Sequence, residues 1–276
     1  MNTTQDPARR VAIVTGASSG IGRAAAVQFA RKGYAVALAA RRQDRLETVA
    51  ARCRDEGGEA LVAVTDVAEP EQIRALLDRT LEAWGQLDVL VNNAGFGICA
   101  RVHETDLDAF RRILEVNVTG LFWACHEAAP IFIEQGSGHI FNVSSVIGKR
   151  GAPFHGAYSA TKHAVCGLSD ALRVELAPYG VHVTTVCPAL TDTEFFDHNR
   201  GPARDAKSRF VRAQTPMPPE IVARKIAAVA GRRRPELIFT AGGRALNWIA
   251  TISPRLADRI MKVYYDALAK HTKGTL

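Results

Sequence analysis

The sequence is poor in the features that mark secreted, metal-binding or membrane-spanning proteins. Its five cysteines are widely spaced and form neither a CxxC pair nor a Cys/His cluster, so we expect no disulfide framework and no metal site. No apolar run reaches the roughly 18 residues of a membrane-spanning helix, and residues 1–10 do not resemble a secretory signal. These absences predict a cytoplasmic protein with reduced thiols.

Aromatic residues are also few, at 7% of the chain, and no stacking-aromatic or DNA-binding pattern accompanies the net charge of +7. The basic residues are scattered, so nucleic acid is not an expected partner. The chain has 276 residues, of which 47% are hydrophobic, and this size is ordinary for one large α/β domain. We therefore predict a single domain over residues 1–276.

Short apolar runs alternate with helix-length segments from residue 10 onward. This alternation is typical of βαβ units, which build a parallel sheet that is buried on both faces. The pattern predicts a Rossmann-like, doubly wound α/β fold with a mostly parallel seven-stranded sheet. The expected strands are Val11–Val14, Ala35–Ala39, Ala60–Val64, Val89–Val91, His139–Val143, His182–Val186 and Leu237–Phe239.

Two segments interrupt or extend this pattern. Residues 193–219 carry four prolines among many charges, and we expect them to form a lid loop over the substrate. Residues 241–276 form a C-terminal extension with apolar positions at helical spacing. A periodic apolar face most often packs on the core or on another subunit. The alternative is peripheral contact with an anionic membrane surface through the basic residues of the extension.

A glycine-rich segment, Thr15-Gly16-Ala17-Ser18-Ser19-Gly20-Ile21-Gly22, directly follows the first strand. The next residues, Arg23–Lys32, predict a helix that ends at Gly33. Glycines at a strand-to-helix turn let the backbone approach a pyrophosphate, and the helix N-terminus offers unpaired N–H groups and a positive dipole. The segment therefore predicts a dinucleotide site, although a tight turn without a ligand would use the same residues.

The residues after the second strand indicate which dinucleotide is bound. In this fold a carboxylate about twenty residues past the glycines holds the ribose 2′-hydroxyl of NAD, but Ala40 stands at that place here. Arg41 and Arg42 follow, and a guanidinium there can hold the 2′-phosphate of NADP by bidentate contact. We therefore predict NADP(H) over NAD(H), with Arg41 as the main contact. The alternative is that both arginines only begin the next helix in solvent.

Four segments, in this order, resemble the short-chain dehydrogenase/reductase family. They are the TGxxxGxG spacing of residues 15–22, Asn92-Asn93-Ala94-Gly95, Ser144-Ser145, and Tyr158-Ser159-Ala160-Thr161-Lys162. The resemblance covers roughly residues 8–240 and implies a Rossmann-like fold, nucleotide binding and a homodimer or homotetramer. One departure follows the sixth strand, where Ala189 replaces the glycine that the family usually has after Pro188.

The resemblance also implies roles for individual residues. The catalytic set would be Asn117, Ser145, Tyr158 and Lys162. The glycines would line the pyrophosphate, Asp66 would meet the adenine, Asn92 would flank the adenosine ribose, and Thr191 and Thr193 would meet the carboxamide. The expected cofactor contacts are Gly16, Ser18, Ser19, Gly20, Ile21, Gly22, Arg41, Arg42, Asp66, Val67, Asn92, Ala94, Gly95, Tyr158, Lys162, Pro188, Thr191 and Thr193.

Tyr158 and Lys162 are four residues apart, so on a helix they project from the same face. An ordinary tyrosine pKa of about 10 is too high for a base near neutrality, but a nearby ammonium and a cationic nicotinamide favour phenolate. We therefore expect Tyr158 to act as the acid/base and Ser145 to hold the substrate oxygen. Asn117 would support a water chain that ends at Lys162.

These residues predict an oxidoreductase that interconverts a ketone or aldehyde and an alcohol. The side chains of Phe96, Val146, Phe154 and His155 indicate an apolar substrate pocket, although His155 is more simply a loop residue. One alternative is a non-catalytic NADP-binding regulator, which the same fold supports but which the intact catalytic set argues against. The other is a lipid or steroid enzyme at a membrane surface, which depends on the C-terminal extension.

Overall fold

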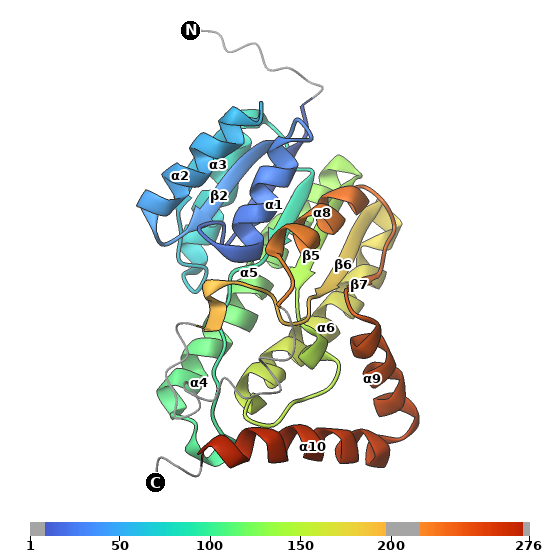
Figure 1. The fold of residues 1–276 in the computed structure, drawn as a ribbon. Coiled ribbons are helices and arrows are strands. Elements are labelled where there is room, and N and C mark those ends of the chain that lie inside the picture. The colour runs from blue at the N-terminus through green and yellow to red at the C-terminus, as the bar shows by residue number, and fades with distance from the viewer. Residues whose placement is uncertain (1–8, 197–215, 273–276) are drawn as a thin grey trace, which may run out of the picture.

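A seven-stranded parallel sheet forms the centre of the computed structural model, which describes residues 9–196 and 216–272 (Figure 1). The strand order is β3-β2-β1-β4-β5-β6-β7, and each neighbouring pair is parallel. This confirms the Rossmann-like fold, and the predicted strand ends are correct to within one residue. The strands are β1 Val11–Thr15, β2 Ala35–Ala40, β3 Ala60–Val64, β4 Val89–Asn92, β5 Gly138–Val143, β6 Val181–Cys187 and β7 Glu236–Ile238.

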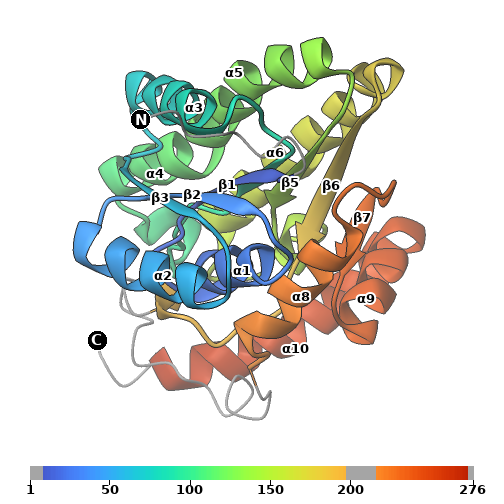
Figure 2. The ribbon, with the colours of Figure 1, turned by 90° about the horizontal axis from the view of Figure 1, so that it is seen from above.

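Helices cover both faces of the sheet, as Figure 2 shows. Helices α1, α2 and α8 bury side chains such as Phe29, Leu46 and Ile226 on one face, and α3, α5 and α6 bury others such as Phe132 and Val165 on the opposite face. Because both faces are covered, the strands are apolar along nearly their whole length. The helices are α1 Gly20–Ala30, α2 Gln43–Asp55, α3 Pro70–Trp84, α4 Leu107–Leu114, α5 Gly120–Gln135, α6 Gly156–Glu175, α8 Pro219–Val229, α9 Ala241–Ile252 and α10 Pro254–Thr272.

Helix α1 begins inside the glycine segment, at Gly20 and not at the predicted Arg23. Ser19 is its extended N-cap residue, but the Ser19 side chain makes no capping hydrogen bond. The N–H groups of the first turn are therefore not used by a cap, and they lie at the carboxyl end of β1. This places the N-terminus of α1 at the edge of the sheet where doubly wound folds bind ligands.

The C-terminal extension forms two helices, α9 and α10, as predicted (Figure 1). Helix α10 packs on the loops that precede α6. The rings of Phe154 and Tyr265 stack with centroids 5.5 Å apart, and Asp258 forms an ion pair with Arg150. Ala257, which also lies on α10, is fully buried. The extension therefore covers the carboxyl-end loops of the α/β core.

The outer side of the same extension carries apolar side chains that are exposed to solvent. Trp248 and Ile252 on α9 are 69% and 77% exposed, and Val263 on α10 is 66% exposed. Among residues 9–196 and 216–272, no helix is both long and apolar enough to cross a membrane. These apolar side chains are therefore exposed on the surface of the described chain.

The predicted lid loop falls largely on residues 197–215, which lie outside the described part of the chain, as do residues 1–8 and 273–276. The two described ends of the loop meet beside the sheet. Thr191 and Met217 form a β-bridge, and the N–H of Met217 donates to the carbonyl of Leu190 at 2.9 Å. The loop therefore starts and finishes next to the carboxyl end of β6.

Candidate active site

The glycine segment makes a tight turn between β1 and α1 that excludes side chains. Gly16 has a φ of +65°, which favours glycine, and a Cβ there would lie 2.8 Å from Nδ2 of Asn93. A Cβ at Gly22 would lie 2.3 Å from the carbonyl oxygen of Gly16. Only glycine fits at these positions, so the turn packs closely and brings the N-terminus of α1 to the carboxyl end of β1, which fits the pyrophosphate of a dinucleotide.

Thr15 and Asn93 hold this turn against the end of β4. The Asn93 side chain donates to the carbonyl of Thr15 at 3.0 Å, and the backbone N–H groups of Asn93 and Ala94 donate to the Thr15 hydroxyl at 3.0 and 3.1 Å. No role was predicted for Thr15 or Asn93 from the sequence. The adjacent asparagines at 92 and 93 could have indicated that one of them faces the glycine turn, because adjacent side chains at a strand end point to opposite faces of the sheet.

The Asn92 side chain points to the opposite face, and the predicted position of Asn92 beside the adenosine ribose stays a prediction. Its amide donates to Oδ1 of Asn142 at 3.0 Å and to Sγ of Cys125 on α5 at 3.3 Å. Asn142 in turn donates to the Ser169 hydroxyl on α6 at 3.0 Å. The Asn92 side chain therefore ties β4 to β5 and to the helices behind the sheet, and Asn93 is the residue that reaches the glycine turn.

The two arginines after β2 point in different directions. The Arg42 guanidinium donates to the hydroxyls of Ser18 and Ser19 at 3.0 Å each, directly before α1. The Arg41 side chain is 71% exposed and lies 4.0 Å from the carboxylate of Asp66. Arg42, which we expected to be the second contact, is therefore the arginine nearer to the glycine turn.

Asp66 follows β3 at the same edge of the sheet, where we expect the adenine. Its carboxylate accepts from Arg112 at 2.6 Å and from the N–H of Ala68 at 3.1 Å. Val67 is buried, and its carbonyl lies so close to α5 that a Cβ on Gly120 would approach it to 2.3 Å. Asp66 is thus held in a fixed position, and its contact with adenine stays a prediction.

The hydroxyl groups of Ser145 and Tyr158 meet at the carboxyl end of β5. Ser145 begins the 3₁₀ turn Val146–Gly148, Tyr158 lies in the first turn of α6, and the Ser145 hydroxyl lies close enough to the phenol to lower the pKa of Tyr158. Burial raises the pKa of Tyr158, and the nearby Ser145 hydroxyl offsets part of that rise. Two hydroxyls that converge in this way can bind and protonate the same oxygen atom.

Lys162 lies one turn beyond Tyr158 on α6, as their spacing predicts. Its buried Nζ is 5.6 Å from the centroid of the Tyr158 ring and donates to the carbonyl of Val143 at 2.8 Å. Burial lowers the pKa of Lys162 to about 8. An ammonium has three donors, so the group can hold a further partner while it stays next to the phenol.

Asn117 lies in a π turn, Glu115–Thr119, between α4 and α5. Such wide turns are rare and often occur at functional sites. The Asn117 side chain accepts from the N–H of Phe96 at 3.0 Å and donates to the Phe96 carbonyl at 2.8 Å and to Thr161 at 3.2 Å. It therefore fixes the loop after β4 against α6, while its predicted water chain to Lys162 stays a prediction.

The segment after β6 folds back toward the glycine turn. The carbonyl of Pro188 accepts from the N–H of Val146 at 3.0 Å, which joins this segment to the turn that contains Ser145. Ala189 adopts a negative φ, so alanine is accommodated in place of the family's glycine. Thr193 lies against the glycine turn, where a Cβ on Gly20 would come within 2.8 Å of its Cγ2.

An apolar wall surrounds the phenol of Tyr158. Ile98 and Ile113 are buried beside it, Phe96 packs on the same cluster, and the Phe195 ring lies with its centroid 5.3 Å from that of Tyr158. These residues come from the loop after β4, from α4 and from the segment after β6. An apolar cluster therefore lies next to Tyr158, and its role as a substrate pocket stays a prediction.

Two residues that we expected in this pocket have structural contacts instead. Phe154 stacks on Tyr265, and the side chain of His155 is hydrogen-bonded to the backbone of Ile98. Burial lowers the pKa of His155, so its ring is neutral and suited to this local role. In the part of the chain that the structure describes, no group of three or more His, Cys, Asp or Glu residues could hold a metal ion.

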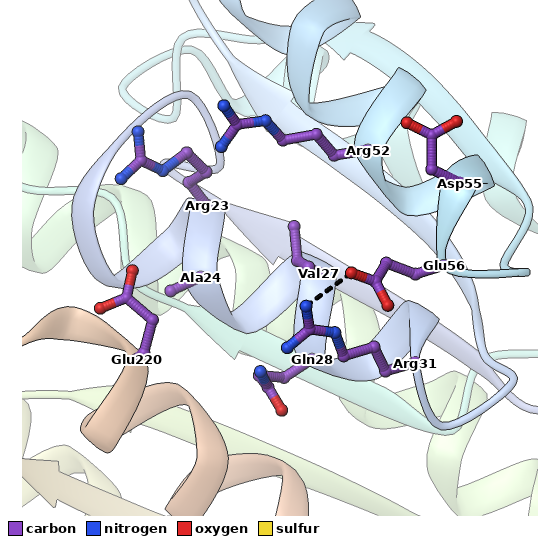
Figure 3. A pocket seen from close by; sticks show the side chains of 9 residues that line it. All are labelled: Arg23, Ala24, Val27, Gln28, Arg31, Arg52, Asp55, Glu56 and Glu220. Atoms are coloured by element: carbon purple, nitrogen blue, oxygen red, sulfur yellow. Dashed lines mark hydrogen bonds and ion pairs between the residues drawn. The ribbon is translucent and has the colours of Figure 1, made fainter.

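A charged hollow of about 360 Å³ lies on the outer side of α1, between α2 and α8 (Figure 3). The ion pair between Arg31 and Glu56, at 2.6 Å, lies along its wall. Charges of both signs line it, and it contains none of the predicted site residues. The hollow is therefore separate from the hydroxyl pair at Tyr158.

Comparisons with known proteins agree with this geometry. The family model for short chain dehydrogenases matches residues 10–203. A 3beta-hydroxysteroid dehydrogenase from Mediterraneibacter gnavus is 38% identical over 201 residues, which are 72% of this chain and 71% of that protein. An alcohol dehydrogenase from the archaeon Thermococcus sibiricus, solved with 5-hydroxy-NADP, has a TM-score of 0.74 and 30% identity over 84% of this chain and 96% of its own.

A xylitol dehydrogenase solved with NAD⁺ has the same TM-score of 0.74, with 28% identity over 80% of this chain and 92% of its own. The chain belongs to the short-chain dehydrogenase family, and it is an oxidoreductase of that family. The predicted family is confirmed. One matched structure holds an NADP derivative and the other holds NAD⁺, so the cofactor preference has to be argued from the residues of this chain.

Proposed function

We propose that this protein uses NADP(H) to interconvert a small hydrophobic ketone or aldehyde and the matching alcohol. The observation that carries the proposal is the buried phenol of Tyr158, which lies beside Ser145 and one helical turn from the buried ammonium of Lys162. The N-terminus of α1 lies at the same edge of the sheet. A hydride donor held there and a proton donor at Tyr158 are the two components that carbonyl reduction requires.

Tyr158 is the proton donor in the direction of reduction. Its phenol donates to the carbonyl oxygen of the substrate, while the Ser145 hydroxyl holds that oxygen by a second hydrogen bond. Bound NADPH supplies the hydride. The glycine turn, Ser18, Ser19 and Arg42 would hold this cofactor, and Lys162 has N–H donors for its nicotinamide ribose.

The pKa shifts in the site suit this cycle. Burial raises the pKa of Tyr158, so the phenol rests in its protonated form and is ready to donate. With a pKa of about 8, Lys162 is positively charged at neutral pH and stabilises the phenolate that remains after the transfer. In the direction of oxidation, the same positive charge favours the phenolate as the base.

The preference for NADP(H) is supported by the charges after β2. Ala40 leaves no carboxylate to bind a ribose 2′-hydroxyl, and the Arg42 guanidinium donates to the hydroxyls of Ser18 and Ser19 in the turn. A charge-assisted hydrogen bond to a phosphate is worth about 1.5 to 3 kcal/mol. A preference of at least about tenfold for NADPH over NADH is therefore expected.

Steady-state kinetics with both cofactors test this preference. We expect Arg42→Ala to lose most of the NADPH preference and Arg41→Ala to lose less, because Arg42 lies nearer to the glycine turn. Ala40→Asp should shift the enzyme toward NADH, because it restores the carboxylate that binds a 2′-hydroxyl. An NADPH-to-NADH ratio that is unchanged in both arginine variants would contradict the proposal.

The substrate class is supported by the apolar wall of Ile98, Ile113 and Phe195 around Tyr158. A turnover screen with NADPH should therefore include hydrophobic ketones, aldehydes and quinones, together with 3-ketosteroids because one relative is a 3beta-hydroxysteroid dehydrogenase. Binding of NADPH without turnover of any compound would favour the alternative, a non-catalytic regulator.

The exposed apolar side of α9 and α10 favours a partner in the assembled protein. We propose that another subunit covers it, which agrees with the expected homodimer or homotetramer. The alternative is peripheral membrane contact, since exposed basic residues such as Arg255, Arg259 and Lys262 lie among the apolar ones.

A further inference from the structure

The carboxylate of Glu194 binds Arg42 and Arg45 beside the glycine turn. Glu194 lies in the 3₁₀ turn Glu194–Phe196, which follows β6. Its Oε2 accepts from Nη1 of Arg42 at 2.9 Å, and its Oε1 accepts from Nη1 of Arg45. These contacts hold the pKa of Glu194 below its usual range, so the carboxylate is charged at neutral pH.

This carboxylate lies next to the dinucleotide turn. The same Arg42 that binds Glu194 also donates to Ser18 and Ser19, so the carboxylate, the guanidinium and the serine hydroxyls form one connected cluster. Two guanidinium groups that share a pair of anionic oxygens are the arrangement that proteins use for phosphate. The segment after β6 therefore supplies an anion where a 2′-phosphate would bind.

We propose that Glu194 is an internal competitor for the 2′-phosphate of the cofactor and thereby sets the cofactor affinity of this enzyme. This inference rests on the proposed use of NADP(H). A 2′-phosphate carries a charge of about −2 and can displace a single carboxylate from Arg42 and Arg45. The neutral 2′-hydroxyl of NAD cannot displace it, so NAD would bind with Glu194 in place.

The competing explanation is that Glu194 orients the two arginines for the cofactor. The two roles predict opposite effects when the charge is removed. A competitor that loses its charge leaves the guanidiniums available, so phosphate ligands bind more tightly. An orienting residue that loses its charge leaves the guanidiniums poorly placed, so the same ligands bind more weakly.

Glu194→Gln in the full chain separates these roles, because glutamine keeps the shape of the side chain and removes its charge. The binding probe is adenosine 2′,5′-bisphosphate, measured by titration calorimetry. We expect roughly three- to tenfold tighter binding of this probe and of NADPH, because the side chains of the cluster are partly exposed and screened by solvent. Binding of NADH should stay within about twofold of the wild-type value.

Asp192→Asn is the matched control. Asp192 is an exposed acidic residue two positions earlier in the same segment, so its substitution changes the net charge equally. We expect Asp192→Asn to bind the probe as the wild type does. Unchanged or weaker binding of the bisphosphate to Glu194→Gln would overturn the inference, as would an equal gain in the Asp192 variant.

The wild-type protein tests the proposed cofactor separately. Tighter binding of NADH than of NADPH to the wild type would contradict the proposed cofactor preference. The response of Glu194→Gln to the bisphosphate would still decide whether Glu194 competes for the anion position. Failure of the inference and failure of the proposed function therefore give different results.

Discussion

At the scale of single residues, the chemistry depends on polar groups that are buried next to one another. Tyr158 and Lys162 are 7% and 3% exposed, and each has a pKa shifted toward its neutral form by burial. Such shifts are typical of functional sites, because an unpaired charge is costly inside a protein. Ser145 and Lys162 both lie close to the Tyr158 side chain, so the proposed mechanism uses the three groups together.

Removal of the Tyr158 hydroxyl should abolish most of the activity. Phenylalanine keeps the ring that packs against Ile98 and Phe195 but cannot donate the proton, so Tyr158→Phe should lose a factor of roughly 10² or more in turnover. Thermal unfolding and NADPH binding should remain close to wild type. Tyr179→Phe, at a position that is 47% exposed, is the control and should keep full turnover. Wild-type turnover in Tyr158→Phe would refute the mechanism.

The sequence predicted a catalytic set but not all the residues that contact and position it. The spacing of Tyr158 and Lys162 follows from helix geometry, so it was predictable within one element. The contact of Asn93 with Thr15 and that of Glu194 with Arg42 join segments that lie far apart in the chain. Such contacts depend on how the loops fold over the sheet, which no local pattern determines.

At the scale of helices and strands, buried polar side chains connect the outer strands of the sheet. His139 on β5 accepts at Nδ1 from the N–H of Gly231 at 3.1 Å, and its Nε2 lies 2.8 Å from the hydroxyl of Thr184 on β6. Thr184 donates onward to the carbonyl of Arg234 just before β7. This chain of bonds uses the neutral histidine, and burial lowers the pKa of His139 to about 3.

Protonation of His139 should make the protein less stable in acid. The pKa of His139 is lower in the folded state than the ordinary value of 6.5. Between about pH 6.5 and 3, His139 is therefore protonated in the unfolded chain but not in the folded chain. Stability that is present above pH 6.5 is therefore lost as the pH falls through this window. From pH 7 to 5 this group should contribute a loss of about 2 kcal/mol in the free energy of unfolding.

Urea unfolding at pH 7 and pH 5 measures this effect. His139→Gln cannot titrate, so it should lose about 2 kcal/mol less than the wild type between the two pH values. The nearest titratable neighbour, His182 on β6, has its ring centroid 5.6 Å from that of His139 and is unchanged in this variant. The exposed His126→Gln is the control and should keep the wild-type loss. An equal loss in His139→Gln and the wild type would show that His139 is not the source.

The strands were more predictable than the turns between them. Buried β-branched runs give a strong signal in a sheet covered on both faces, and this is why the predicted ends of β1 to β7 are correct to within one residue. The start of α1 was placed too late, because glycine is a poor helix former, yet Gly20 and Gly22 lie in its first turn. Close packing against the end of β4 outweighs helix propensity at that position.

At the scale of the whole molecule, the C-terminal extension has one side on the core and one side in solvent. Buried Ala257 and the stacked Phe154–Tyr265 pair fix α10 over the carboxyl-end loops. Trp248, Ile252 and Val263 remain exposed on the outer side. Exposed large apolar side chains that gather on one surface mark a contact with another protein or with lipid.

We expect the outer side of the extension to bind a second subunit. Trp248→Ser combined with Ile252→Ser keeps both helices but removes two of the most exposed apolar groups, so it should lower the molar mass measured by light scattering. A chain that ends at Gly243 should show the same decrease. Val64→Ser, at the opposite edge of the sheet and 51% exposed, is the control and should keep the wild-type mass.

Flotation with anionic vesicles separates this assembly from membrane contact. We expect neither the full chain nor the chain that ends at Gly243 to float. Flotation of the full chain alone, with an unchanged molar mass in the serine variants, would contradict the subunit contact. That result would favour a lipid-surface enzyme instead.

The π turn at Glu115–Thr119 has a consequence for the length of this segment. A π turn holds about one residue more than an α-helical turn. The side-chain directions of α5 are therefore rotated by about 100° relative to those of α4, although α4, the π turn and α5 follow one another without a break. Loss of a single residue here would restore one uninterrupted register and rotate Asn117 away from Phe96 without changing its identity. The site therefore depends on a one-residue insertion. A substitution of Asn117 removes a side chain and keeps the π turn. A deletion of one residue removes the π turn and keeps the side chains of Asn117, Ser145, Tyr158 and Lys162 in the chain.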